Sequence, residues 1–282
     1  MRKYIKYLLF VKPKNIVLKN FWNLIFYFKY KNSGKDFKKI IDTNRETLTR
    51  LGELISENEY RKTDYGIPDK NFGIIDKQIN QTPSNFDLIT FLLQKIKHDS
   101  INYLEIGVSI MKNFMILDAF FENLNLVAYD INPIVAKNIE KFEKLSNDSN
   151  KLYVSNNTNN TLYYFQGDVL SDDDTSEFNK ILTLKYDFIY SDALHTKEGI
   201  ESEYENLIKN NLNEKFIIYY DDLDIKWGIP GVESAVFTIF DDMKVRIPKL
   251  KLFTFWINGW LGQNEKPHKN AIITKSLVIL KI

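Results

Sequence analysis

The sequence predicts an α/β fold in which helices cover both faces of a mostly parallel β-sheet. From residue 86 onward, short apolar segments alternate with longer amphipathic ones, a pattern typical of parallel strands joined by crossover helices. The short segments are almost continuously apolar, as expected for strands buried on both faces. Near the end of the sequence, two strand-like segments flank a polar loop. We therefore expect a closing hairpin that places one antiparallel strand at the sheet edge.

Five apolar segments are predicted to form the central strands. They combine β-branched and aromatic residues over seven or eight positions, which favours buried strands over loops. Their sequences are INYLEIG at 101–107, NLVAYDI at 125–131, LYYFQGDV at 162–169, YDFIYSD at 186–192 and KFIIYYD at 215–221. The closing hairpin is expected from strands near 251–260 and 271–282, joined by the loop 262–270.

Helices are predicted between these strands, where apolar residues recur at helical spacing. They span 86–97, 111–122, 133–145, 195–212 and 231–243. Pro133 suits the first position of its helix, because a proline there removes no intrahelical hydrogen bond.

An amino-terminal extension, residues 1–84, is expected to precede this domain, residues 85–282. Its first 40 residues carry eleven Lys and Arg and one acid, a net charge of +10, whereas the whole chain is +1. The extension is expected to be mainly helical, with a helix over 36–60. Turn-forming residues between 61 and 84 mark the boundary.

The basic extension is also rich in aromatic residues, which leaves alternatives open. It packs on the main domain with its lysines in solvent, or it contacts an anionic membrane surface through residues 1–40. No recognition motif accompanies it, so we expect no nucleic-acid binding. No apolar run reaches the ~18–20 residues of a membrane span, and none resembles a signal peptide. We expect a cytoplasmic protein, peripheral at most on a membrane and not secreted.

The chain of 282 residues contains no cysteine. Disulfides, zinc–thiolate sites, iron–sulfur clusters and cysteine nucleophiles are therefore excluded. The sequence leaves oxygen-ligated metals as the metal chemistry open to it.

Three residues that end successive predicted strands indicate an adenosine-containing ligand. Ligands of open parallel sheets bind beyond the carboxyl ends of the strands. Gly107 ends the first strand, where a glycine lets backbone approach a ligand closely. Asp130 ends the second strand, at a spacing typical of an acid that accepts ribose hydroxyls, and Asp168 ends the third. Each alone is compatible with an ordinary turn, but together and in this order they favour adenosine.

The fourth and fifth predicted strands end in carboxylates, Asp192 and the pair Asp221 and Asp222. Three carboxylates that converge on one end of a sheet repel each other and raise their pKa values. A hard divalent cation such as Mg²⁺ or Ca²⁺ relieves this repulsion. The alternative is that these acids cap helices or stand in loops.

His195, three residues after Asp192, is the histidine best placed for chemistry. It is expected at the start of a helix, where the helix dipole disfavours the imidazolium form. A neutral imidazole there could act as a general base. His98 and His268 are interpreted as structural.

Taken in order, these strand-end residues resemble class I S-adenosylmethionine-dependent methyltransferases. The residues that carry the resemblance are Glu105, Gly107, Asp130, Asp168, Asp192, His195, Asp221 and Asp222. Within that class they look most like the metal-dependent sugar O-methyltransferases of the macrocin O-methyltransferase type, and more distantly like catechol O-methyltransferase. The resemblance covers roughly residues 86–282. It implies a Rossmann-like sheet, mostly parallel with an antiparallel last hairpin.

The resemblance also implies the cofactors, S-adenosylmethionine and Mg²⁺ or another divalent cation, and the role of each residue. His195 would be the catalytic base. The metal ligands would be Asp192, Asp221 and Asp222. The cofactor-binding residues would be Glu105, Gly107, Ser109, Asp130, Ile131, Asp168 and Asp192. Of these, Glu105, Gly107 and Ser109 would line the methionine side, Asp130 the ribose and Asp168 the adenine.

The chain departs from that family in two loops. Ser109 and Met111 stand where the family commonly has glycines, and Ala193 and Leu194 interrupt an otherwise acid-rich Asp-x-x-His motif. The dinucleotide fingerprint Gly-x-Gly-x-x-Gly is absent, which disfavours a nicotinamide enzyme.

The resemblance implies an O-methyltransferase that acts on a hydroxyl of a sugar, glycan or similar diol, with a homo-oligomer as an open alternative to a monomer. Two other functions stay open. One is a non-catalytic binding protein built on a decayed methyltransferase. The other is a methyltransferase that works without metal on a small molecule or a protein.

Overall fold

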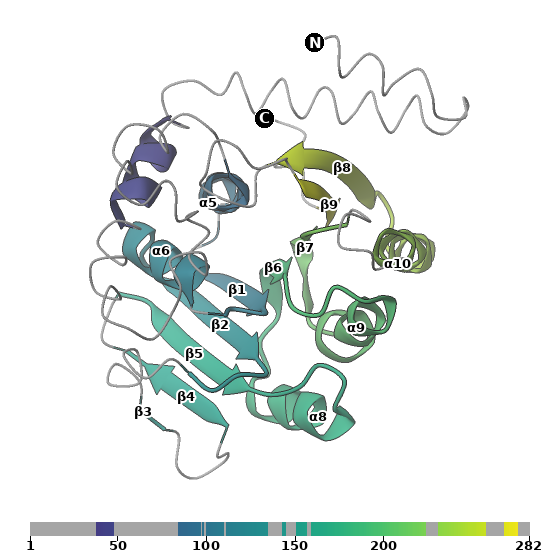
Figure 1. Ribbon diagram of the computed structural model, residues 1–282, viewed down its shortest axis with the longest axis horizontal. Helices are drawn as coiled ribbons and strands as arrows, with labels where there is room; N and C mark the ends of the chain where they lie inside the picture. The colour runs from purple at the N-terminus through teal and green to yellow at the C-terminus, as the bar shows by residue number, and fades with distance from the viewer. Residues whose placement is uncertain are drawn as a thin grey trace, which may run out of the picture.

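A nine-stranded mixed β-sheet organises the chain and carries helices on both faces (Figure 1). The computed structural model describes residues 38–47, 84–96, 98, 100–109, 111–134, 143–144, 151–156, 159–223, 231–257 and 268–275.

The centre of the sheet is five parallel strands in the order β5-β2-β1-β6-β7. These strands are β1 Ile101–Ile106, β2 Leu124–Asp130, β5 Thr161–Gln166, β6 Tyr186–Ser191 and β7 Leu212–Tyr220. The strand order reverses on either side of β1, which makes the crevice beyond the carboxyl ends of β1, β2 and β6 the switch point at which such folds bind ligands.

Antiparallel strands extend the sheet at both edges. At one edge β8 Lys251–Ile257 and β9 His268–Thr274 form the predicted hairpin. At the other, β3 Glu143–Lys144 and β4 Leu152–Ser155 pair antiparallel onto β5. The predicted fold class is confirmed as an α/β, Rossmann-like sheet that is mostly parallel and has an antiparallel last hairpin.

Two cores lie on the two faces of the sheet because successive strand side chains alternate between them. Helices α5 Asn85–Lys95 and α6 Lys112–Phe120 cover one core. Helices α8 Asp172–Ile181, α9 Lys197–Ser202, the π-helical turn η4 Glu203–Ile208 and α10 Val232–Arg246 cover the other. In β1, for example, Tyr103 packs in the first core and Leu104 in the second.

Several sequence predictions need correction. The antiparallel strand β9 is not at the edge, because it inserts between β7 and β8. Residues 268–270 belong to β9 rather than to the predicted loop. Residues 143–144, predicted helical, form β3. Strand β4 and helix α8 were not predicted.

A buried ion pair ties the amino-terminal region to the main domain. Residues 38–47 are helical, as predicted. From this helix the Arg45 guanidinium donates to both carboxylate oxygens of Asp87 in α5, at 2.9 and 2.7 Å. Asp87 is fully buried, and it also accepts hydrogen bonds from Asn44 and from the backbone and side chain of Ser84.

The predictions for residues 1–37 and 48–83 lie outside the described residues. Within the described part of the chain, every helix is too short or too polar to cross a membrane.

Candidate functional site

Gly107 lets the loop after β1 pass against the loop after β6. Its φ is +84°, in the left-handed region, and a Cβ there would lie 2.4 Å from the carbonyl oxygen of Asp192. Only glycine avoids both the clash and the backbone strain. Gly107, which the sequence predicts at the end of the first strand, therefore allows the backbones of these two loops to approach closely.

Ser109 and Met111, which stand where the methyltransferases that the sequence resembles commonly have glycines, adopt glycine-like backbone conformations. Their φ values are 48° and 62°, and the left-handed region costs a non-glycine residue on the order of 1 kcal/mol. The Met111 side chain is fully buried in the core on the α5–α6 face. The large Met111 side chain therefore contributes to the packing of this core.

Asp130 holds this loop in place from the end of β2. One carboxylate oxygen accepts the backbone N–H groups of Val108 and Ser109, both at 2.8 Å. The other accepts the backbone and side-chain N–H groups of Asn132, at 2.8 and 2.9 Å. These four hydrogen bonds match the four acceptor positions of a carboxylate. A ribose hydroxyl would have to replace or share one of them.

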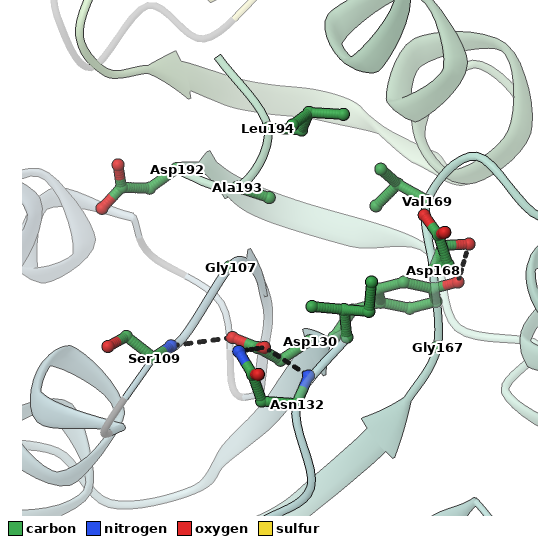
Figure 2. Close-up of a pocket in the computed structure, with 12 residues that line it drawn as sticks. Gly107, Ser109, Asp130, Asn132, Gly167, Asp168, Val169, Asp192, Ala193 and Leu194 are labelled. Carbon is green, nitrogen blue, oxygen red and sulfur yellow. Dashed lines mark hydrogen bonds between the residues drawn. The ribbon is translucent and has the colours of Figure 1, made fainter. Parts of the chain in front are cut away.

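A cavity of about 310 Å³ opens beside this loop, at the carboxyl ends of β1, β2, β5 and β6 (Figure 2). It is lined by Gly107, Ser109, Tyr129, Asp130, Ile131, Asn132, Gly167, Asp168, Val169, Asp192, Ala193 and Leu194. Six of the seven predicted cofactor residues are in this lining. Ile131 is 60% exposed and Leu194 is 37% exposed, so the cavity presents apolar side chains that a flat apolar ligand would cover.

Glu105, the seventh predicted cofactor residue, is buried behind the cavity. Its carboxylate accepts hydrogen bonds from Asn113 at 2.8 Å and from the Tyr103 hydroxyl at 2.9 Å. Burial raises its pKa to about 8 despite these two hydrogen bonds. In this structure Glu105 joins β1 to α6 and is not among the residues that line the cavity.

Tyr190 brings two of the predicted metal ligands together. Its hydroxyl lies 2.7 Å from Asp221 Oδ2 and 3.1 Å from Asp192 Oδ2. Asn85, at the start of α5, donates to the same Asp221 oxygen at 2.8 Å. Burial, followed by the charges of Asp192 and Asp222, raises the pKa of Asp221 to about 7.

His195 lies beside Asp192, with 3.3 Å between Nε2 and Asp192 Oδ1. Burial acts to lower the pKa of His195. The hydrogen bond to Asp192 and the charges of Asp192, Asp222 and Asp221 outweigh burial and raise it to about 9. The expectation of a neutral imidazole is therefore wrong here, because the carboxylates favour the imidazolium form.

The side chain of Asp222, the third predicted ligand, contacts His268, while its backbone N–H donates to Asp221 Oδ1 at 2.9 Å. His268 Nδ1 approaches Asp222 Oδ1, and the His268 side chain is only 3% exposed. His268 is the first residue of β9. Because β9 pairs with β7, the His268 imidazole lies next to Asp222, which follows the end of β7.

The arrangement as it stands does not fit a divalent cation. Each of the three carboxylates is already held by protein donors or by an imidazole. Among the described residues, no group of three or more His, Asp or Glu side chains is placed to hold a metal ion. Magnesium binding stays a prediction.

Sequence reasoning missed three residues of the carboxylate cluster, Asn85, Tyr190 and His268. Asn85 precedes Tyr190 by 105 residues and Asp221 by 136, and no local pattern encodes such a contact. His268 carried a weak signal, as a histidine in a segment expected to join the closing hairpin. Its contact with Asp222 depends on the register of β9, which the sequence does not reveal.

No protein-family model and no curated protein sequence matches the chain. Solved structures with a similar arrangement include a putative O-methyltransferase from Klebsiella pneumoniae, 13% identical, with a TM-score of 0.44 over 91% of this chain and 98% of that one. A putative caffeoyl-CoA O-methyltransferase from Staphylococcus aureus is 16% identical, with a TM-score of 0.44 over 83% and 99%. The O-methyltransferase TomG from Streptomyces achromogenes, solved with S-adenosylmethionine, is 12% identical, with a TM-score of 0.46 over 80% and 94%. These likenesses are too distant to assign an activity to this chain.

Proposed function

We propose that the protein is an S-adenosylmethionine-dependent O-methyltransferase. The observation that carries the proposal is the position of Asp192, which lines the cavity and also contacts His195. One residue therefore joins a cavity suited to an adenosine ligand to a candidate general base. The acceptor class, a hydroxyl of a sugar or similar diol, comes from the sequence resemblance alone.

The residues of the cavity suit the cofactor. Gly107 has no side chain to block the close approach of backbone and ligand. Asp130 stands where ribose hydroxyls are expected, and the exposed Ile131 side chain offers an apolar surface to the adenine ring. Bound there, S-adenosylmethionine would supply a methyl group on a sulfonium centre, which passes to the acceptor oxygen and leaves S-adenosylhomocysteine and a methyl ether.

His195 would take the proton that the acceptor hydroxyl loses. In the neutral ring, Nε2–H donates to Asp192 and leaves Nδ1 free to accept this proton. The His195 side chain is 28% exposed, so the imidazolium that forms can return the proton to solvent. Asp192 orients the ring and stabilises its charged form.

Cofactor binding is tested by titrating S-adenosylmethionine and S-adenosylhomocysteine calorimetrically. We expect Ile131→Ala to weaken both by about five- to tenfold, because its exposed side chain loses apolar contact at little cost to folding. Val245→Ala is the matched control, since Val245 is 87% exposed on α10 and does not line the cavity. Gly107→Ala should abolish binding, because its Cβ would meet the Asp192 backbone.

Methyl transfer is then measured by mass spectrometry on a panel of sugars and diols. Absence of cofactor binding by the unmodified chain would show that the proposed function is wrong. Binding without transfer to any hydroxyl would favour the alternative of a non-catalytic binding protein.

A further inference from the structure

Asp130 accepts one hydrogen bond that can be released without a change in the backbone. Three of its four donors are backbone N–H groups, those of Val108, Ser109 and Asn132. These donors stay in place as long as the loops after β1 and β2 keep their path. The fourth donor is the Asn132 side-chain amide, at 2.9 Å from Asp130 Oδ1 (Figure 2). A rotation of that side chain alone would free an acceptor position on Asp130.

The backbone of Asn132 is held independently of its side-chain amide. Its carbonyl accepts a hydrogen bond from the Tyr164 hydroxyl of β5 at 2.9 Å, and its N–H donates to Asp130 at 2.8 Å. Pro133 follows Asn132, and a residue before proline is restricted to extended conformations. The Asn132 side chain can therefore turn while the loop after β2 keeps its conformation.

The Asn132 side chain is also placed where a ligand would meet it. Asn132 lines the cavity and is exposed to solvent, and exposed side chains change rotamer within nanoseconds. Water can satisfy the amide once it has turned away, so the cost of the rotation is the net value of one hydrogen bond to a carboxylate. A hydroxyl that approaches Asp130 from the cavity can therefore displace the Asn132 amide more easily than it can displace a backbone donor.

We propose that Asn132 sets the affinity of the cavity for ribose. Its amide holds the acceptor position on Asp130 that a ribose hydroxyl takes, and it must turn away before the hydroxyl can bind. Asn132 is then a competitor of the ligand and not a contact to it. The proposal rests on the proposed function, because that function supplies an adenosine ligand with a ribose diol.

The test compares the calorimetric affinity of S-adenosylhomocysteine for the unmodified chain and for Asn132→Ala. Alanine keeps the backbone N–H that donates to Asp130 and removes the competing amide. We expect Asn132→Ala to bind about three- to tenfold more tightly, because only the unmodified chain loses a hydrogen bond to Asp130 when the ligand binds. Weaker binding would show that Asn132 contacts the ligand, and equal binding would show that its amide does not compete. Either result would overturn the proposal.

A second pair of ligands shows whether the gain comes from the ribose hydroxyls. Adenosine and 2′,3′-dideoxyadenosine differ only in these hydroxyls, and ligand-observed nuclear magnetic resonance measures both even if they bind weakly. Asn132→Ala should bind adenosine more tightly but dideoxyadenosine within about twofold of the unmodified chain, since the two changes are coupled only through the freed acceptor position. An equal gain for both ligands would mean that alanine merely enlarges the cavity, and it would contradict the role of Asn132.

The matched control is Asn125→Ala. Asn125 also belongs to the β2 segment and also donates its amide to a side chain, Asn102 Oδ1 at 2.7 Å, but it lies near the opposite end of the strand from the cavity. Its loss should leave the affinity for S-adenosylhomocysteine unchanged. If neither the unmodified chain nor Asn132→Ala binds S-adenosylhomocysteine or adenosine, the proposed function fails together with this proposal. If both chains bind with the same affinity, only the role of Asn132 fails.

Discussion

His195→Ala is expected to lower turnover by about 100- to 10,000-fold, the usual contribution of a general base, while cofactor affinity stays within about twofold. The imidazole contacts Asp192 but is not among the residues that line the cavity, so its loss should affect proton transfer more than binding. Single-turnover rates and calorimetry separate the two effects.

His98→Ala is the matched control for this substitution. His98 also contacts a carboxylate, with 3.0 Å between Nδ1 and Asp187 Oδ1, but it precedes β1 and so lies at the opposite end of the strands from the cavity. Its loss should leave turnover unchanged. Equal turnover in His195→Ala and the unmodified chain would remove His195 from the mechanism.

The pKa of His195 predicts how the rate of methyl transfer depends on pH. A base with a pKa of about 9 is mostly protonated and inactive at neutral pH, so the rate should rise about tenfold per pH unit and level off above pH 9. Asp192 raises that pKa, so in Asp192→Asn the rise should move to lower pH. A profile that is flat between pH 6 and 9, at a chemical step shown to be rate-limiting, would contradict the assignment.

Asp87→Ala is expected to lower the free energy of unfolding by about 3–5 kcal/mol, because it breaks a buried ion pair by removing the carboxylate. The side chains of Arg45 and Asp87 are only 6% and 0% exposed, so water cannot replace the lost contact. Urea denaturation followed by circular dichroism measures the change.

An exposed ion pair provides the comparison. Asp242 contacts Arg246 one helical turn away on α10, with side chains 50% and 43% exposed, and exposed pairs contribute about 0–1 kcal/mol. Asp242→Ala should therefore cost far less than Asp87→Ala. Similar costs for the two would show that the Arg45–Asp87 pair does not anchor the amino-terminal helix.

The central strands and the acids at their ends could be predicted because both follow from local pattern. Buried parallel strands are continuously apolar, and the residue after each one must stand at the ligand-binding edge. This reasoning placed Asp130, Asp168 and Asp192 around one cavity. It could not foresee that all four acceptor positions of Asp130 are taken by the loops after β1 and β2, because those contacts depend on the exact path of the backbone.

Helix α8 carried a signal that was overlooked. Ser171 accepts a hydrogen bond from the Asp174 N–H, and three aspartates occupy the first turn, which is the pattern of a capped helix start.

The position of β9 has a consequence for the order of assembly. Because β9 lies between β7 and β8, β8 cannot join the sheet until the chain has doubled back and β9 has paired with a strand about fifty residues earlier. Pairings of such long sequence separation form slowly, since the entropy of closing the loop is lost before the contacts are gained. His268, the first residue of β9, reaches Asp222 only when this step is complete. The contact between Asp222 and His268 and the pairing of β9 with β7 are therefore completed together. A chain stalled before this step would have the cavity beside Asp192 but not the contact between Asp222 and His268.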